Sequence, residues 1–372
     1  MTGSVTLIFL LLLHTSSIVA FVWNHQSLVR GYYSLSSSSS LASSSSSASA
    51  DLLLSKVKGK TLVSVPEILE IFNAFNDSSI TNQVKFIDAS WWHKGPQDAG
   101  RHLFEKGPRI PNSIYFDIDD ICLPSELNPK NLPHMIPPSI LFSTIMDHFQ
   151  ISKDDHIFIY ARDGVIFTPR TWFIFRAFGH DPTKIHLMQG SLEEWMDLDG
   201  PVENDFQQVP RAKDIMEQVP KENGSYVPKY QALPSPKNVC DLQYMLRVVE
   251  KNDIHPSSND EQSILIDSRG SSFHKSGHMP GAIHIPYSSY TRSDNALKFK
   301  SIQELKQVFQ NVGIDPLTNQ QIIATCGSGV SVCHTLLALE LCGRNLDHDF
   351  MYDGSWAEWS MEECTPKVCN TT

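Results

Sequence analysis

The strongest constraint in this sequence is an internal duplication. Four short segments recur in the same order and at similar spacing in two halves of the chain. They are VKFIDASWW (84–92), RIPNSIYFDID (109–119), HIFIYARDG (156–164) and HLMQGSLEEW (186–195) in the first copy, and SILIDSR (263–269), HMPGAIHIP (278–286), QIIATCGSG (321–329) and FMYDGSWAEW (350–359) in the second. Arg162 and Cys326 hold matching positions 164 residues apart. This repetition predicts two copies of one domain.

Each copy alternates strand-like and helix-like segments. Residues 157–160 and 322–324 are short apolar runs, whereas 169–178 and 331–341 have helical spacing of apolar residues. Strands that alternate with helices predict the α/β class, here two tandem domains, each with a mostly parallel central sheet flanked by helices. The connecting residues 201–238 are rich in Pro, Lys, Glu and Asn and are expected to form a surface linker. Two such domains would meet at a cleft, a common place for a site.

Composition excludes several classes of function. The net charge of −11 argues against nucleic-acid binding, because no basic surface is expected. The seven cysteines are odd in number and widely spread, which argues against a disulfide scaffold and favours a reducing compartment. The chain has no zinc-ligand spacing and no phosphate- or dinucleotide-binding glycine motif, so we expect no metal and no cofactor.

The first 57 residues differ from the rest. The short apolar run LIFLLLL (7–13) is followed by small residues, which predicts a signal peptide over residues 1–20. Twelve of the residues from Ser34 to Ser49 are serine, so residues 21–57 are expected to be a disordered, transit-like segment. This order resembles the bipartite leader of algal complex plastids. We therefore expect plastid localisation, with the secretory pathway and the mitochondrion as alternatives, and no membrane contact of the mature form.

The loop CGSGV carries the clearest chemical signal. A strand ends at Thr325, and Cys326 is followed by Gly327, Ser328 and Gly329 before a helix begins. Such a loop presents backbone N–H groups at the positive end of a helix, and glycines allow the positive φ angles that this requires. We expect it to lower the pKa of the Cys326 thiol below about 8.5 and to make this residue a nucleophile, rather than a buried core cysteine. The first copy has Arg162 at this position and is therefore predicted to be inactive.

The two copies, the CGSGV loop, the His-Met-x-Pro element at 134–137 and the ending YDGSWAEW resemble the two-domain rhodanese family, and within it the 3-mercaptopyruvate sulfurtransferase branch. The resemblance covers about residues 58–365. It implies an inactive first domain (58–200), a catalytic second domain (239–365) and a C-terminal tail (366–372). It also implies that Gly327, Gly329, Val330 and Ser331 surround a persulfide on Cys326.

The resemblance predicts the reaction class. Phosphatases with a related loop have an arginine six residues after the cysteine, where this chain has Val332. Thiosulfate-preferring members of the family have cations in the loop, whereas Gly327 and Ser328 are neutral, as in the mercaptopyruvate branch. The expected activity is transfer of sulfur from 3-mercaptopyruvate to a thiol or cyanide. The alternatives are thiosulfate:cyanide sulfurtransferase and a slow sulfur carrier or redox sensor.

Other site residues follow from the same resemblance. A proton relay is expected from Ser328, His134 and Asp119. Family arginines that bind the donor carboxylate are missing, since Ser272 replaces one of them, so Lys275 and Arg269 are the candidates in this chain. The expected partners are a small-molecule sulfur donor and a thiol acceptor such as thioredoxin, with the protein a monomer or weak dimer.

Overall fold

The computed structural model describes residues 8–11, 19–24, 27–28, 51–75, 83–96, 98–219, 226–254 and 262–369. Residues 1–51 form one unit, in which β1 (Ile8–Leu11), β2 (Val19–Asn24) and β3 (Ser27–Leu28) make a small antiparallel sheet. The predicted serine tract lies outside the described residues. Within the described ranges, every helix is too short or too polar to span a membrane.

The second unit, residues 52–372, contains two five-stranded parallel sheets. The first has the strand order β4 (Leu62–Ser64), β8 (Ile185–Gln189), β7 (His156–Tyr160), β5 (Val84–Asp88), β6 (Ile114–Tyr115). The second has the order β9 (Val239–Cys240), β13 (Phe350–Tyr352), β12 (Ile322–Thr325), β10 (Ile264–Asp267), β11 (Ile283–His284). The two orders correspond strand for strand, so the predicted duplication and α/β class are confirmed.

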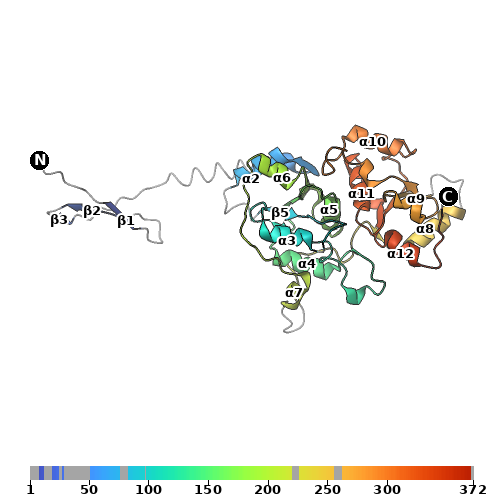
Figure 1. Cartoon of the computed structure of the whole chain (residues 1–372), viewed down its shortest axis with the longest axis horizontal. Coiled ribbons are helices and arrows are strands. Elements are labelled where there is room, and N and C mark those ends of the chain that lie inside the picture. The colour runs from blue at the N-terminus through green and yellow to red at the C-terminus, as the bar shows by residue number, and fades with distance from the viewer. Residues whose placement is uncertain are drawn as a thin grey trace. The chain divides into compact units, whose positions relative to one another are not determined.

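Helices flank each sheet, and Figure 1 shows the elements of the two copies as two neighbouring groups. The first copy has α2 (Val65–Ala74), α3 (Ala99–Lys106), α4 (Ser139–His148), α5 (Thr168–Ala177) and α6 (Leu192–Asp197), and α7 (Ala212–Glu217) follows in the connection. The second copy has α8 (Leu242–Ile254), α9 (Ser272–Ser276), α10 (Ile302–Gln310), α11 (Val332–Leu341) and α12 (Ser355–Met361). The 3₁₀ turns are η2 (Ser125–Leu127), η3 (Pro182–Lys184), η4 (Tyr287–Ser289) and η5 (Leu346–His348).

Local sequence explains why these elements begin and end where they do. Ser64 ends β4 and caps α2, since its hydroxyl accepts a hydrogen bond from the Glu67 N–H while the Glu67 side chain accepts one from the Ser64 N–H. Such a cap is worth about 1 kcal/mol. All five residues of β7 are buried, as expected for a strand in a parallel sheet with both faces covered.

The two copies share one hydrophobic core through helices α5 and α11, which contact each other. Trp172 and Phe173 of α5 and Leu336 of α11 are buried in that core. Nearly every residue of α5 is buried, because the helix packs on its own sheet and on the second copy. The copies are therefore held at a fixed interface rather than joined only by the linker.

The described residues include part of the segment that we assigned to the leader. Residues 51–57 are helical, and the side chains of Leu54 and Val57 are buried. Residues three apart lie on the same face of a helix, so the helical conformation lets Leu54 and Val57 be buried together.

Candidate active site

Cys326 lies directly after the carboxyl end of β12, and α11 begins six residues later. The residue is 1% exposed and lines a cavity of about 610 Å³, which we call the nucleophile cavity. Its backbone N–H donates to the Ser355 hydroxyl (3.2 Å), and its carbonyl oxygen accepts from the Trp356 N–H (3.0 Å). The first residues of α12 therefore hold the backbone of Cys326 in place through these two hydrogen bonds. The carboxyl ends of parallel strands are the usual place for a site in an α/β fold.

The loop after Cys326 offers a row of free donors. Among the described residues, the backbone N–H groups of residues 327–331 donate no hydrogen bond. Gly327, Ser328, Val330 and Ser331 line the nucleophile cavity together with Cys326. Free N–H groups at the amino end of a helix favour a bound anion, so the loop is suited to a thiolate or persulfide.

The two glycines of the loop have different roles. Gly329 has a φ of 79°, and a Cβ atom there would lie 2.8 Å from the backbone oxygen of Asp353. Gly327 has no positive φ, and a Cβ there would meet nothing within 4 Å. We expected both glycines to supply positive φ angles. That expectation was wrong for Gly327, whose backbone adopts a conformation open to any residue.

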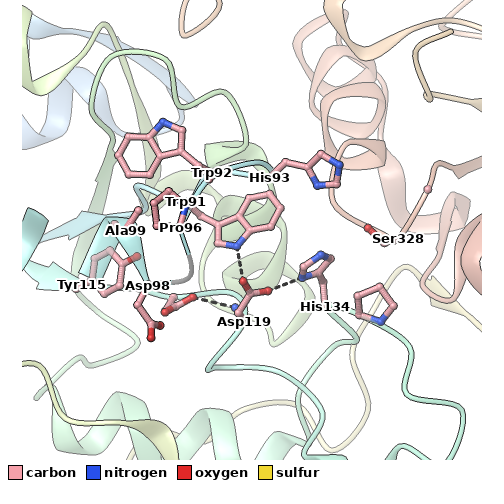
Figure 2. A pocket seen from close by; sticks show the side chains of 15 residues that line it. Trp91, Trp92, His93, Pro96, Asp98, Ala99, Tyr115, Asp119, His134 and Ser328 are labelled. Atoms are coloured by element: carbon pink, nitrogen blue, oxygen red, sulfur yellow. Dashed lines mark hydrogen bonds and ion pairs between the residues drawn. The ribbon is translucent and has the colours of Figure 1, made fainter. Parts of the chain in front are cut away.

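Asp119 and His134 form a contact pair on the first copy (Figure 2). His134 Nδ1 lies 2.6 Å from Asp119 Oδ1, and the indole N–H of Trp91 donates to Asp119 Oδ2, also at 2.6 Å. Burial opposes ionisation of Asp119, but the close contact with His134 and the hydrogen bond from Trp91 outweigh it and hold the pKa of this carboxyl below its usual value. The carboxylate is thus kept ionised beside the imidazole.

The predicted relay residues converge on one space. His134 and Asp119 line a second cavity of about 670 Å³, the relay cavity, which Ser328 (Figure 2) and Gly327 of the second copy also line. Among the described residues, no hydrogen bond joins Ser328 to His134. Of the three predicted relay residues, His134 and Asp119 are therefore in contact, and Ser328 lines the same cavity.

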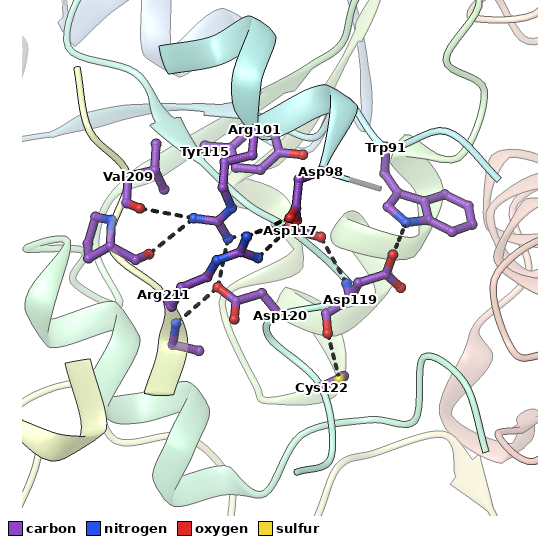
Figure 3. Close-up of polar contacts among 12 residues, drawn as sticks. Trp91, Asp98, Arg101, Tyr115, Asp117, Asp119, Asp120, Cys122, Val209 and Arg211 are labelled. Atoms are coloured by element: carbon purple, nitrogen blue, oxygen red, sulfur yellow. Dashed lines mark hydrogen bonds and ion pairs between the residues drawn. The ribbon is translucent and has the colours of Figure 1, made fainter. Parts of the chain in front are cut away.

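A buried network behind Asp119 fixes its backbone (Figure 3). The Asp119 N–H donates to Asp117 Oδ1 (3.0 Å), and Arg101 contacts both Asp117 (3.4 Å) and Asp120 (2.8 Å). Burial raises the pKa of Asp117 to about 6, although Arg101 and the Asp119 N–H oppose this. The segment that carries the relay carboxylate is therefore held by several buried contacts.

The two predicted substrate cations lie in different surroundings. Lys275 is exposed on α9 and does not line the nucleophile cavity or the relay cavity. Arg269 lines the nucleophile cavity but is 4% exposed, and its guanidinium is paired with Asp267 (2.8 Å). Arg269 also stacks on the ring of Trp356, 4.4 Å from the centroid. Its charge is therefore compensated and its position is fixed.

Arg162 lies just after the carboxyl end of β7, at the position of the first copy that corresponds to Cys326 after β12. Its side chain is buried and donates to the carbonyl oxygens of Leu103 (3.2 Å) and Pro108 (2.5 Å). The loop of the first copy is thus occupied by a structural arginine, and no nucleophile stands there.

Several site residues were missed from the sequence. Trp91, His93 and Lys94 line the nucleophile cavity, and Ser355 contacts the backbone of Cys326. The first three follow the carboxyl end of β5, which is adjacent to β7 in the sheet. That position was a usable signal, since loops at the carboxyl ends of parallel strands build the site in such folds.

Comparisons with known proteins agree with this geometry. The Rhodanese-like domain family matches residues 73–198 and 251–362. The chain is 29% identical to thiosulfate sulfurtransferase of Gallus gallus, over 81% of this chain and 93% of that protein. It is 27% identical to 3-mercaptopyruvate sulfurtransferase of Rattus norvegicus, over 81% of this chain and 92% of that protein.

Among solved structures, the sulfur transferase subunit of yeast mitochondrial complex I is 28% identical, with a TM-score of 0.63 over 82% of this chain and 97% of that chain. The 3-mercaptopyruvate sulfotransferase SseA from Escherichia coli shares the fold, with a TM-score of 0.61 over 80% of this chain and 98% of that chain, at 24% identity. The two family matches fall on the two copies found in the sequence. The chain therefore belongs to the rhodanese-like family, as a sulfurtransferase with two tandem domains.

Proposed function

We propose that the chain transfers sulfur from 3-mercaptopyruvate to a thiol acceptor or cyanide through a persulfide on Cys326. The observation that carries this proposal is the position of Cys326 in a cavity wall, followed by five backbone N–H groups that have no partner among the described residues. Donors fixed around developing negative charge usually make the largest single contribution to such a reaction.

The reaction has two half-steps. The Cys326 thiolate attacks the sulfur of the donor, the carbon–sulfur bond breaks, and its electron pair leaves with the enolate of pyruvate, which takes a proton at carbon. The new sulfur–sulfur bond leaves a persulfide on Cys326. An acceptor thiolate or cyanide then attacks the outer sulfur, and the electron pair of the sulfur–sulfur bond returns to Cys326.

The proton for pyruvate is proposed to come through Ser328, His134 and Asp119. The contact of 2.6 Å between His134 and Asp119, and the common cavity with Ser328, support this assignment. His134→Gln and Asp119→Asn should each lower kcat by roughly a hundredfold or more, the usual range for a lost general acid–base group. Asp163→Asn, an exposed carboxylate in the equivalent loop of the first copy, is the matched control and should leave kcat unchanged.

The choice of donor rests on the loop. Residues 327–331 carry no charged side chain, which favours a singly charged carboxylate donor over the doubly charged thiosulfate. The test compares kcat/KM for the two donors with cyanide as common acceptor, with Cys326→Ser as the inactive control. A preference for thiosulfate would replace the proposal with thiosulfate:cyanide sulfurtransferase.

Mass spectrometry separates an enzyme from a slow carrier. Incubation with 3-mercaptopyruvate should add one sulfur atom to the peptide that contains Cys326, and a thiol such as reduced thioredoxin should remove it repeatedly. A single stoichiometric modification without turnover would instead indicate a sulfur carrier or redox sensor.

A further inference from the structure

Two cavities meet at the loop of Cys326, and they differ in charge. Trp91, His93 and Ser328 line both of them. The relay cavity is also lined by Asp98, Asp117 and Asp119, and by no lysine or arginine among the described residues. The nucleophile cavity is lined by two cationic side chains and, within the described part of the chain, by no carboxylate. An anion is therefore favoured in the cavity that contains Cys326.

The two cations of the nucleophile cavity are Lys94 and Arg269. Arg269 is paired with Asp267 through three contacts of 2.8 to 3.0 Å, so its charge is largely compensated. Lys94 is exposed and forms no ion pair with any carboxylate that the structure describes. Its charge is available to a ligand in this cavity.

His93 does not supply a second charge at neutral pH. Burial, with smaller contributions from His134 and Lys94, lowers the pKa of His93 below its ordinary value, and Asp119 opposes this only in part. An imidazole with an ordinary pKa near 6.5 is already mostly neutral at pH 7. Among the described residues that line the nucleophile cavity, Lys94 is thus the cation whose charge is not balanced by a neighbouring carboxylate.

We propose that Lys94 binds the anionic group of the sulfur donor. The proposal rests on the proposed function, in which the donor is an anion. Lys94 belongs to the first copy and Cys326 to the second, so the inactive first domain would contribute the binding cation. Of the carboxylates of the relay cavity, Asp98 is paired with Arg211 (2.7 Å) and Asp117 with Arg101 (3.4 Å). Asp119, which has no lysine or arginine partner among the described residues, would repel the same anion and keep its charged end on the side of Lys94.

The first test needs no turnover. Iodoacetate is an anion and iodoacetamide is neutral, and both form a thioether when a thiolate displaces iodide. The ratio of their rates at Cys326 therefore reports the local preference for an anion. Each rate is followed by mass spectrometry of the peptide that contains Cys326, because Cys364 and Cys369 are exposed and also react.

Lys94→Met should lower the ratio of iodoacetate to iodoacetamide rates roughly five- to tenfold, as expected for loss of one nearby charge. Lys94→Arg should retain the ratio. The matched control is Lys275→Met, an exposed lysine that lines neither cavity, and it should leave the ratio unchanged. An unchanged ratio in Lys94→Met would overturn the proposal.

Steady-state kinetics provide the second test. Lys94→Met should raise KM for 3-mercaptopyruvate about tenfold with little change in kcat, because the contact is made equally to donor and transition state. If the unmodified protein turns over neither 3-mercaptopyruvate nor thiosulfate, the proposed function fails while the alkylation ratio still decides the role of Lys94. If turnover is normal and both KM and the ratio are unaffected in Lys94→Met, only the inference about Lys94 fails.

Discussion

Arg170 on α5 of the first copy donates a hydrogen bond to the backbone oxygen of Gly329, in the loop that carries Cys326, at 2.8 Å. The same guanidinium donates to the backbone oxygen of His134 and lies 3.3 Å from Asp353 Oδ1. Asp353 in turn accepts a hydrogen bond from the Ile136 N–H (2.8 Å). One buried ion pair therefore ties the relay histidine to the nucleophile loop across the two copies.

Arg170→Met is expected to destabilise the protein by about 3–5 kcal/mol, because it leaves the buried Asp353 carboxylate without its cation. It should also lower kcat/KM, since the carbonyl groups of Gly329 and His134 lose a common donor. Urea unfolding and donor kinetics measure the two effects. The double variant Arg170→Met/Asp353→Leu should recover part of the stability but not the activity.

Arg176 on the same helix is the matched control for Arg170. It pairs with Glu340 at 2.6 Å, its side chain is more exposed, and neither residue lines the nucleophile cavity or the relay cavity. Arg176→Met should cost less stability and leave kcat/KM close to that of the unmodified protein. Equal effects of the two substitutions on both quantities would contradict the role given to Arg170.

The two loop glycines should respond differently to alanine. Gly329→Ala introduces a Cβ 2.8 Å from the Asp353 backbone oxygen at a φ of 79°, so we expect a loss of stability of about 1–3 kcal/mol and strongly reduced turnover. Gly327→Ala meets no atom within 4 Å and should retain its stability. Thermal unfolding of the two variants measures the difference, and a Gly329→Ala protein as stable as Gly327→Ala would show that the loop adjusts freely.

Trp91→Phe should reduce kcat about tenfold or more with little change in KM, as expected when one hydrogen bond to a charged relay group is lost. The substitution keeps an aromatic ring against His134, whose centroid is 5.0 Å away, but removes the donor to Asp119 Oδ2. That donor helps to hold the pKa of Asp119 low, so the acid side of the kcat profile should also move to higher pH.

Trp92→Phe is the control for Trp91→Phe. Trp92 lines the same two cavities, and its indole N–H makes no hydrogen bond to the described residues. Its replacement should leave the pH profile in place. If Trp91→Phe behaves in the same way, the indole is a packing group and the carboxylate is oriented by His134 alone.

A buried histidine pair should make stability fall below pH 6.5. His156 Nδ1 and His186 Nε2 lie 2.9 Å apart in stacked rings within the first sheet. Burial lowers the pKa of His156 to about 3 and that of His186 to about 4. The unfolded chain takes up protons near pH 6.5 and the folded chain does not, so the stability present above pH 6.5 is lost as pH falls toward 4.

The size of this loss is at most about 1.4 kcal/mol per pH unit for each histidine.

Asp117, with its pKa raised to about 6, makes the folded state more stable as pH falls and so opposes the effect of the histidines. The test is therefore a difference between variants. In His156→Leu/His186→Leu, the slope of unfolding free energy between pH 6.5 and 4.5 should be smaller than in the unmodified protein by up to about 2.8 kcal/mol per pH unit. His148→Leu, at an exposed histidine on α4, should not change the slope. Equal slopes in all three proteins would refute the prediction.

The sequence alone determined the duplication, the parallel α/β architecture and the position of the nucleophile loop. Each of these depends on information that is local in the chain. The strand β12, the glycine-containing loop and the helix α11 are consecutive, so the position of Cys326 between them follows from residue order. The same holds for helices 169–178 and 331–341, which the structure shows as α5 and α11 with nearly the predicted bounds.

Only the tertiary structure decided which distant side chains face Cys326. Lys275 is near in sequence to Arg269 but lies outside both cavities, whereas Lys94, 232 residues before Cys326, lines the nucleophile cavity. Arg170 could not be separated from Arg176 by sequence, because both are arginines on one helix, and only one meets Gly329. Which residues meet across the two copies depends on how α5 and α11 pack, and that packing is set by the shared core and its buried ion pair rather than by any local pattern.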